Sequence, residues 1–564
     1  MNTPQDSPRT PTPLDAIAEQ YVLDLAALHP TLATELGLPG FDDQLGDYSP
    51  EGHEAIADHT RATLREVEHC EVVDDVDRVT QAAMRERLGV ELELYEAGEH
   101  LRDLNVIASP PQELRDIFSL APQETEEDWA NIAARMDALP EAIASYAQSL
   151  RAGRAAETLP SLRQIEAVIK QADDVADVDS SMFTSLVANA SLASGAVPGA
   201  LHSDLTEAAK HARQAYADLA QFLSEHLAPE AEDEDAVGRE RYERFSRAFL
   251  GARIDLEETY EWGLERLAAI IAEQQATAEE LYGPGTSIEE AMRTLDREPA
   301  RILTGTEALR EWMQRTSDEA IEALGGEHFE IPAPLRTLEC CIAPTKTGGI
   351  YYTGPSDDFS RPGRMWWSVP DGVTEFTTWR EKTTVYHEGV PGHHLQLGQA
   401  AYLRDTLNLW RRQFCWVSGH GEGWALYAER LMAQLGYLAE PGDRMGMLDA
   451  QRLRAARVVL DIGVHLELDC PPEWGGGRWD ATRAWAFLKA NANMDEAFLR
   501  FELDRYLGWP GQAPSYAVGQ RLWTEIREAT EAREGAAFDL RAFHGRALRL
   551  GSVGLDVLRE ALAS

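Results

Sequence analysis

Apolar residues recur at helical spacing along most of the chain. Leucine, alanine and other apolar residues return every three or four positions, which places them on one face of an α-helix. From Leu14 onward this pattern predicts helices with short interruptions, whereas residues 1–13, rich in Pro, Thr and Ser, are expected to form a loose tail. The segments with the clearest helical spacing are 51–105, 126–150, 162–172, 205–227 and 256–281.

The pattern changes near residue 330. Two prolines within 331–334 end the helical spacing, and the segments 348–354 and 364–370 predict two short strands around a Pro-Gly turn. This ribbon is either an ordinary two-stranded element or an edge that pairs with an extended peptide. After Thr383 the spacing is helical again nearly to the end, so the fold is expected to be mainly α.

Charge and cysteine content narrow the choice of partner and compartment. The 564 residues include 52 basic and 96 acidic ones, a net charge of −44, which argues against nucleic acid or an anionic membrane as partner. The acidic run 229–238 is expected to be a solvated loop. The five cysteines lack Cys-x-x-Cys spacing, and no signal-like start or bilayer-spanning apolar run is present. We therefore expect a soluble protein of the cytoplasm.

The chemistry of the chain is concentrated in the segment 386–394, Tyr-His-Glu-Gly-Val-Pro-Gly-His-His. Three of the 15 histidines fall here, and Glu388 directly follows His387. Imidazole nitrogens hold zinc, and a neighbouring carboxylate serves as the base that deprotonates water. In the familiar His-Glu-x-x-His arrangement the histidines lie one helical turn apart. Here His393 and His394 follow His387 by six and seven positions, so neither would reach the same ion on a regular helix.

Three residues in this segment disfavour a regular helix. Pro391 lacks the N–H that helix geometry requires, and Gly389 and Gly392 permit unusual backbone angles. If two residues loop out, His393 becomes the second ligand, and if three do, His394 takes that place. The alternative is a plain Pro-Gly helix break with solvated histidines.

Two later segments offer the remaining groups. Glu422 and Glu429 lie seven positions apart and share one helix face, so the first could be a third ligand and the second an acceptor for a ligand histidine. Tyr516 follows two proline-containing turns at the head of a helix, where its hydroxyl could donate to an oxyanion. Each feature also has an ordinary explanation, as a helix surface or a packed side chain.

Segments 387–394, 422–429 and 505–519 resemble the signature blocks of a bacterial family known as domain of unknown function 885. That family in turn resembles the helical gluzincin peptidases, namely the carboxypeptidase Taq, thimet oligopeptidase and angiotensin-converting enzyme groups. Their motif is His-Glu-x-Gly-His or a close variant, and Gly392-His393 resembles its ending with two residues inserted, which favours His393 over His394. Residues 514–519 resemble a Pro-Thr-Tyr-x-Leu-Gly block of the carboxypeptidase Taq group.

The resemblance implies an architecture for the whole chain. Two helical halves, residues 14–335 and 336–564, would form one interlocked unit around a deep substrate channel, with a small β ribbon near the active site. The second half would carry the metal site.

The resemblance also implies a function, zinc-dependent hydrolysis of peptide bonds in short or unfolded peptides. One Zn²⁺ per chain would be held by His387, His393 and Glu422. Glu388 would act as the base, and Tyr516, together with His465, would stabilise the oxyanion. The alternatives are a metal-dependent amidase acting on a non-peptide amide, and a non-catalytic helical binding protein, a pseudoenzyme in which Pro391-Gly392 has abolished the metal site.

Overall fold

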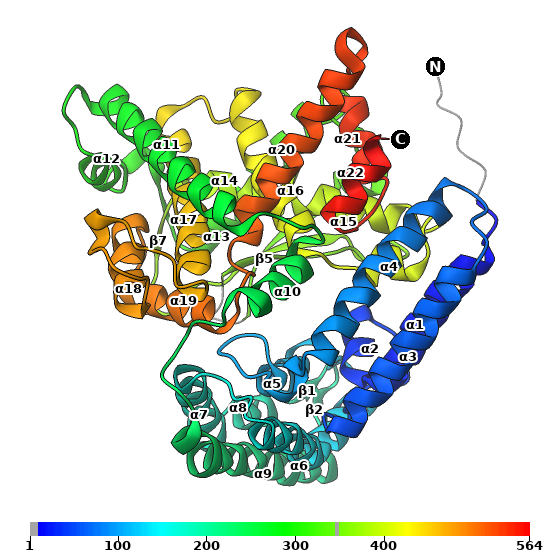
Figure 1. Ribbon diagram of the computed structural model, residues 1–564. Helices are drawn as coiled ribbons and strands as arrows, with labels where there is room; N and C mark the ends of the chain where they lie inside the picture. Colours follow the sequence, from blue (N-terminus) through cyan, green and yellow to red (C-terminus); the bar gives the residue numbers. More distant parts are fainter. Residues whose placement is uncertain (1–8, 345–348, 564) are drawn as a thin grey trace.

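The computed structural model of the protein describes residues 9–344 and 349–563, most of which are helical (Figure 1). The helices before residue 335 are α1 (Pro13–Leu28), α2 (Pro30–Leu36), α3 (Pro50–His69), α4 (Asp75–Glu96), α5 (Pro110–Leu120), α6 (Glu126–Ala155), α7 (Leu162–Ala176), α8 (Met182–Ala188), α9 (Gly199–Phe222), α10 (Arg239–Leu250), α11 (Leu256–Tyr282), α12 (Ile288–Leu295) and α13 (Thr306–Leu324). The helices after it are α14 (Thr378–Glu388), α15 (His393–Tyr402), α16 (Ser418–Gln434), α17 (Pro441–His465), α18 (Ala481–Asn491), α19 (Glu496–Gly508), α20 (Ser515–Glu534), α21 (Leu540–Leu548) and α22 (Leu555–Ala563). The mainly α class predicted from the apolar pattern is confirmed.

Local sequence signals account for where several helices begin. The predicted segment 126–150 is the first part of α6, which starts after Thr125. There the amide of Asp128 donates to the Thr125 hydroxyl at 3.1 Å, and the amide of Thr125 donates to the Asp128 carboxylate at 2.8 Å. The segment 51–105 is divided between α3 and α4, because the chain turns after His69 and Asp74 caps a new helix.

The chain before α1 is only partly described. Residues 1–8 of the predicted tail lie outside the described residues. Arg9, in contrast, is held by ion pairs with Asp15 at 2.5 Å and Asp74 at 2.6 Å. These contacts fix the start of α1 against the start of α4.

The strands among the described residues are short and form three small sheets. They are β1 (Ser191–Leu192), β2 (Gly195–Ala196), β3 (Ile302–Thr304), β4 (Leu338–Ile342), β5 (Ile350–Thr353), β6 (Gly363–Trp367) and β7 (Glu375–Thr377). The predicted ribbon is confirmed as the antiparallel pair of β5 and β6, although residue 348 of its first segment lies outside the described residues. The parallel partner of β6, strand β4, was not predicted, and it leaves β5 as an edge strand.

Buried apolar side chains form two large clusters. One joins helices from both ends of the chain, with members from Leu14 to Leu88 and from Tyr242 to Leu562. The other lies within residues 48–227, mainly in α5 to α9, which occupy the lower part of Figure 1. The division of the chain at residue 335 stays a prediction.

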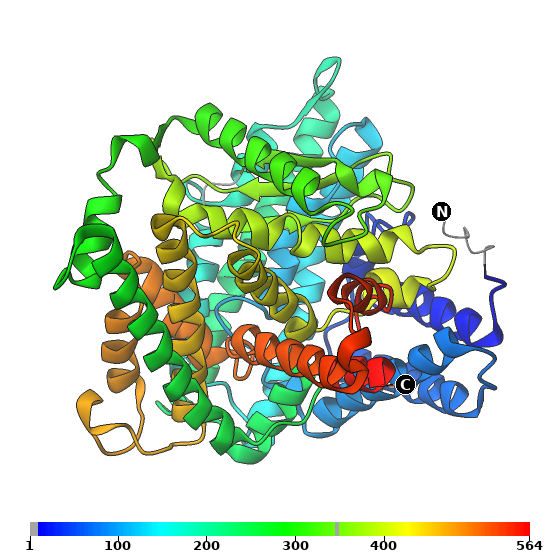
Figure 2. The same cartoon turned by 90° about the horizontal axis from the view of Figure 1, so that it is seen from above.

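The helices that carry the candidate site lie inside the first cluster. In Figure 2 the yellow-green segments around residues 378–402 run through the middle of the molecule. Helix α14 packs against both α16 and α17, and α16 packs along α20. Two glycines allow this last pair to come close, since a Cβ added at Gly423 would lie 2.5 Å from the backbone of Gly519. None of the described helices is long and apolar enough to cross a membrane.

Candidate metal centre

The segment 387–394 contains two helices rather than one. Helix α14 ends at Glu388 and α15 begins at His393, and the Val390–Pro391 peptide bond between them is cis. Across this break the amide of Gly392 donates to the carbonyl of Tyr386 at 3.1 Å, six residues back. The predicted departure from a regular helix is therefore present, but as a full interruption rather than a bulge within one helix.

The close approach of the chain to itself explains the glycine at position 392. A Cβ at Gly392 would lie 1.8 Å from the carbonyl oxygen of His387, a distance that no side chain can occupy. The indole N–H of Trp424, a fully buried side chain, donates to the carbonyl of Pro391 at 2.8 Å. Helix α16 thus holds the turn that sets the path between the two histidine-bearing helices.

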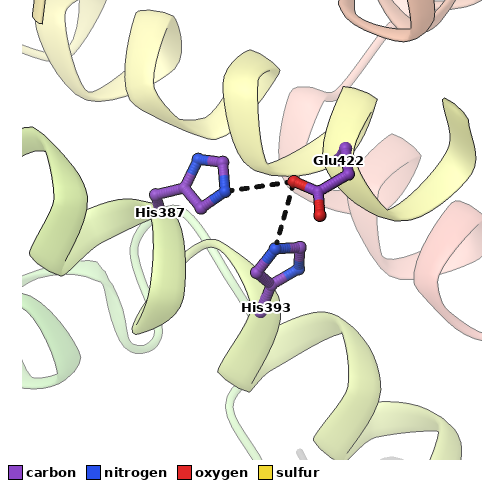
Figure 3. A group of neighbouring side chains, drawn as sticks. All are labelled: His387, His393 and Glu422. Carbon is purple, nitrogen blue, oxygen red and sulfur yellow. Dashed lines mark ion pairs between the residues drawn. The ribbon is translucent and has the colours of Figure 1, made fainter. Parts of the chain in front are cut away.

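This path brings His387, His393 and Glu422 together (Figure 3). Oε2 of Glu422 lies 3.3 Å from Nε2 of His387 and 3.6 Å from Nε2 of His393. One potential ligand atom from each residue lies within 4.8 Å of the others, which is the spacing that ligands of one ion require. No other group of three or more His, Cys, Asp or Glu with this spacing is found among residues 9–344 and 349–563.

The donor set fits a zinc ion. Oε2 of Glu422, the atom that faces Nε2 of both histidines, is buried and has no hydrogen-bond partner among the described residues. An unpaired buried oxygen is costly, so a cation held between Glu422 and the two histidines would satisfy what the protein does not. Two imidazoles and one carboxylate are a ligand set of catalytic zinc sites, which keep a further position for water or substrate.

A second carboxylate orients one of the histidines. Nδ1 of His387 donates to Oε1 of Glu429 at 2.8 Å, and the hydroxyl of Thr383 donates to Oε2 of Glu429 at 2.6 Å. Glu429 is 1% exposed and lies two turns after Glu422 on α16. Glu429 thus accepts a hydrogen bond from a candidate ligand histidine, as predicted. The other ring nitrogen of His387, Nε2, faces Glu422.

His394 points away from this cluster. Its Nε2 donates to the carbonyl of Leu335 at 2.9 Å, and its Nδ1 accepts from the hydroxyl of Tyr352 on β5 at 2.9 Å. Burial lowers the pKa of His394 to about 4, which keeps the ring neutral in this position. Of the two alternatives left open by the sequence, His393 is the one beside His387.

The charges of the cluster favour an ionised Glu422 carboxylate and a protonated, positively charged His387. Burial opposes both charges, but the ion pair with Glu422 and the hydrogen bond with Glu429 raise the pKa of His387 to about 10. The neighbouring His393 and His387 hold the pKa of Glu422 well below its usual range. Zinc would have to displace the proton of His387, because only the neutral imidazole binds a metal.

Glu388 is the last residue of α14 and is buried, with 7% of its surface exposed. Burial raises the pKa of its carboxyl group, and the charges of Glu422 and Glu429 act in the same direction, against those of His387 and His393. A carboxylate with a raised pKa beside the donor cluster has the properties of a general base.

Tyr516 lies in the first turn of α20, close to Glu422. Burial raises the pKa of Tyr516, and the negative charge of Glu422 contributes to the same shift. The guanidinium of Arg457 lies over the Tyr516 ring, 5.1 Å from its centre, and donates to Glu502 at 2.7 Å. Arg457 was not predicted as a site residue, because a lone arginine on a long helix carries no motif.

His465 has a different environment. Nε2 of His465 donates to the carbonyl of Tyr506 at 2.9 Å. The backbone carbonyl of His465 accepts from the amide of Gly238 at 3.0 Å. These bonds join the end of α17 to α19 and to the start of α10. A role of His465 at the oxyanion stays a prediction.

A cavity of about 840 Å³ lies away from the cluster. It is lined by parts of α3, α4, α10, the acidic loop and residues 507–510, and neither histidine of the cluster nor Glu422 contributes to it. The deep channel that the family resemblance implies therefore stays a prediction.

The fold and the cluster define a helical protein with a candidate two-histidine, one-carboxylate metal site, and comparison with known proteins places it. Residues 30–562 match the model of the family described as "Bacterial protein of unknown function (DUF885)", so the chain belongs to that family, as its signature blocks predicted. No protein with a curated description matches it.

Two solved structures are similar over almost the whole chain. One is a "putative lipoprotein" from Colwellia psychrerythraea, with a TM-score of 0.82 and 23% identity over 98% of both chains. The other is a "putative lipoprotein of unknown function" from Shewanella oneidensis, with a TM-score of 0.74 and 18% identity over 98% of this chain and 100% of that one. At these identities the likeness concerns the fold alone.

Proposed function

We propose that this protein is a zinc-dependent hydrolase that cleaves peptide bonds in short or unfolded peptides. The observation that carries the proposal is the convergence of His387, His393 and Glu422, with Glu388 beside them and Glu429 bonded to His387. The resemblance to the helical gluzincin peptidases supports the same reading. Zinc in such a site supplies Lewis acidity, which polarises a carbonyl group and lowers the pKa of water.

Each residue of the chain then has a defined task. Glu429 keeps the proton of His387 on Nδ1, so that Nε2 is available as a ligand atom. Glu388 accepts the proton of the attacking water and delivers it to the leaving amine. Tyr516 donates a hydrogen bond to the oxygen on which negative charge develops.

The geometry supports a catalytic protein over a pseudoenzyme. The two residues by which this motif exceeds the usual one lie in the turn between α14 and α15, and that turn brings His393 beside His387. The insertion therefore preserves the donor set. A location in the cytoplasm and the absence of nucleic-acid and membrane partners stay predictions.

The first test is the metal content of protein purified without chelator. We expect about one zinc per chain in the wild type and loss of that zinc in His387→Ala and in Glu422→Ala, because three-ligand sites need every ligand. Plasma emission spectroscopy measures the occupancy. Full occupancy in both variants would refute the assignment of the ligands.

Two further variants serve as comparisons in the measurement of zinc content. Glu429→Gln retains all three ligands but loses the charged acceptor of His387, so its zinc affinity is expected to fall about 10–100-fold. His394→Gln alters the histidine that faces Tyr352 and Leu335 instead of the cluster, and it is expected to keep one zinc per chain. Zinc loss in His394→Gln with full occupancy in His393→Ala would reverse the choice between the two histidines.

A further inference from the structure

Trp416 is an exposed aromatic residue beside the buried cluster. It lies between the π-helical turn η6 (Trp410–Phe414) and α16, and its neighbours Cys415 and Val417 are 6% and 1% exposed. Trp416 itself is 48% exposed. The local chain therefore anchors both neighbours in the core and leaves the indole at the surface.

The indole is held in place against the helix that carries Glu422. A Cβ added at Gly421 would lie 2.2 Å from Cη2 of Trp416, so the absent side chain of Gly421 is what makes room for the ring. The ring centre of Trp416 also lies 6.3 Å from that of His393, at a tilt of 54°. The ring thus lies beside His393 and against Gly421, the residue that precedes Glu422.

About half of the Trp416 side chain is exposed to solvent, so this apolar surface is not packed in the protein core. A single exposed apolar residue is common on protein surfaces and needs no explanation by itself. Trp416 differs because its ring contacts a metal-ligand candidate and the backbone next to another. The exposed indole of Trp416 is therefore adjacent to the candidate metal centre.

We propose that Trp416 forms an apolar subsite that binds a large hydrophobic side chain of the substrate next to the cleaved bond. An aromatic or aliphatic side chain covering the indole would bury apolar area on both partners. The inference deepens the proposed function, on which it rests for the identity of the ligand as a peptide. It makes peptides with a large apolar residue the favoured substrate class.

The test uses binding, so that it does not depend on turnover. The variant Glu388→Gln, loaded with zinc, is titrated in a calorimeter with two five-residue peptides, Ala-Ala-Phe-Ala-Ala and Ala-Ala-Ser-Ala-Ala. We expect the phenylalanine peptide to bind at least about 10-fold more tightly, and Glu388→Gln/Trp416→Ala to lose most of that difference. Adding Trp416→Phe instead should retain a large part of it, because a smaller aromatic ring still offers a face.

Two controls separate the subsite from other roles of Trp416. Leu23→Ala removes an equally exposed apolar side chain on α1, 46% exposed, and should leave the preference unchanged. The zinc content of Trp416→Ala should equal that of the wild type. Zinc loss would show that the indole protects His393 and does not bind substrate, and this result would overturn the inference.

Further outcomes are equally decisive. Equal weakening of both peptides by Trp416→Ala, an unchanged preference, or failure of both peptides to bind Glu388→Gln would each overturn the subsite. The cleavage of the same peptides by the wild type is followed separately by chromatography. Absence of cleavage together with Trp416-dependent binding would refute the peptidase proposal while the apolar subsite stands.

Discussion

At the scale of single residues, the candidate centre depends on which nitrogen of each histidine is free. Glu429 occupies Nδ1 of His387, while His394 uses both of its nitrogens for Leu335 and Tyr352. Only a histidine with an unoccupied nitrogen can bind a metal. These hydrogen bonds therefore distinguish His387 from His394, although both histidines are buried.

Glu388→Gln tests the base at this scale. The amide has nearly the same shape as the carboxylate but cannot accept a proton, so zinc content and stability should stay close to those of the wild type. Turnover of a cleaved peptide is expected to fall about 10²–10⁴-fold. Steady-state kinetics with parallel metal analysis measures both quantities, and a variant as fast as the wild type would remove Glu388 from the mechanism.

At the scale of elements, the break between α14 and α15 and the contact of α16 with α20 build the centre. The first places His393 after a turn that Trp424 holds by its bond to Pro391. The second brings the first turn of α20 next to Glu422, because Gly423 and Gly519 have no side chains between the two helices. Each of these helices contributes one or two side chains to the candidate centre, so no single helix forms the centre alone.

Gly392→Ala tests the break. The added Cβ would meet the His387 carbonyl oxygen at 1.8 Å, so the turn must open and His393 must move. We expect a loss of about 2–4 kcal/mol in the free energy of unfolding, together with loss of zinc. Denaturant titration and metal analysis measure the two effects.

Gly89→Ala is the matched control for this substitution. A Cβ at Gly89, within α4, meets no atom within 4 Å, and alanine is the better helix former. The variant should therefore be unchanged or more stable by up to about 1 kcal/mol. A Gly392→Ala protein with wild-type stability and zinc content would mean that the turn tolerates a side chain and that our account of it is wrong.

At the scale of the whole molecule, buried histidines make the stability depend on pH. His544 on α21 is 1% exposed and pairs through Nε2 with the hydroxyl of Tyr427 on α16 at 2.8 Å. Burial, with the charges of Arg527 and His328, lowers its pKa to about 3. The folded protein thus keeps His544 neutral at pH values at which the unfolded chain protonates it.

The sign of the effect follows from this difference. Between the unfolded pKa of about 6.5 and the folded value of about 3, the unfolded state binds one more proton, so stability falls as the pH falls. One such histidine contributes a slope of about 1.4 kcal/mol per pH unit, or about 2 kcal/mol between pH 6.5 and 5. Urea unfolding of the wild type and of His544→Gln at pH 7 and 5 should differ by about this amount in pH dependence. Identical pH dependence would exclude His544 as a source.

The sequence by itself determined the helical class and most of the residues of the candidate centre. The spacing of apolar residues reports which local structure can bury one face, so segments such as 126–150 and 256–281 were placed from periodicity alone. His387 and Glu388 were identified because they belong to a cluster of histidines with an adjacent carboxylate. Glu422 and Glu429 were identified because they lie seven positions apart on one helix face, in a segment that resembles a signature block of the family. Local patterns carry this information directly.

Only the tertiary structure decided how these groups are arranged. The parallel pairing of β4 with β6, the hydrogen bond from Trp424 that holds the turn at 389–392, and the positions of Arg457 and Trp416 all depend on contacts between segments that lie apart in the sequence. His465 shows the same limit, since its ring nitrogen bonds to the backbone of Tyr506, 41 residues further on. The physical reason is that helical periodicity fixes which face is buried, whereas the close packing of helices on one another selects its partners and the side chains that meet.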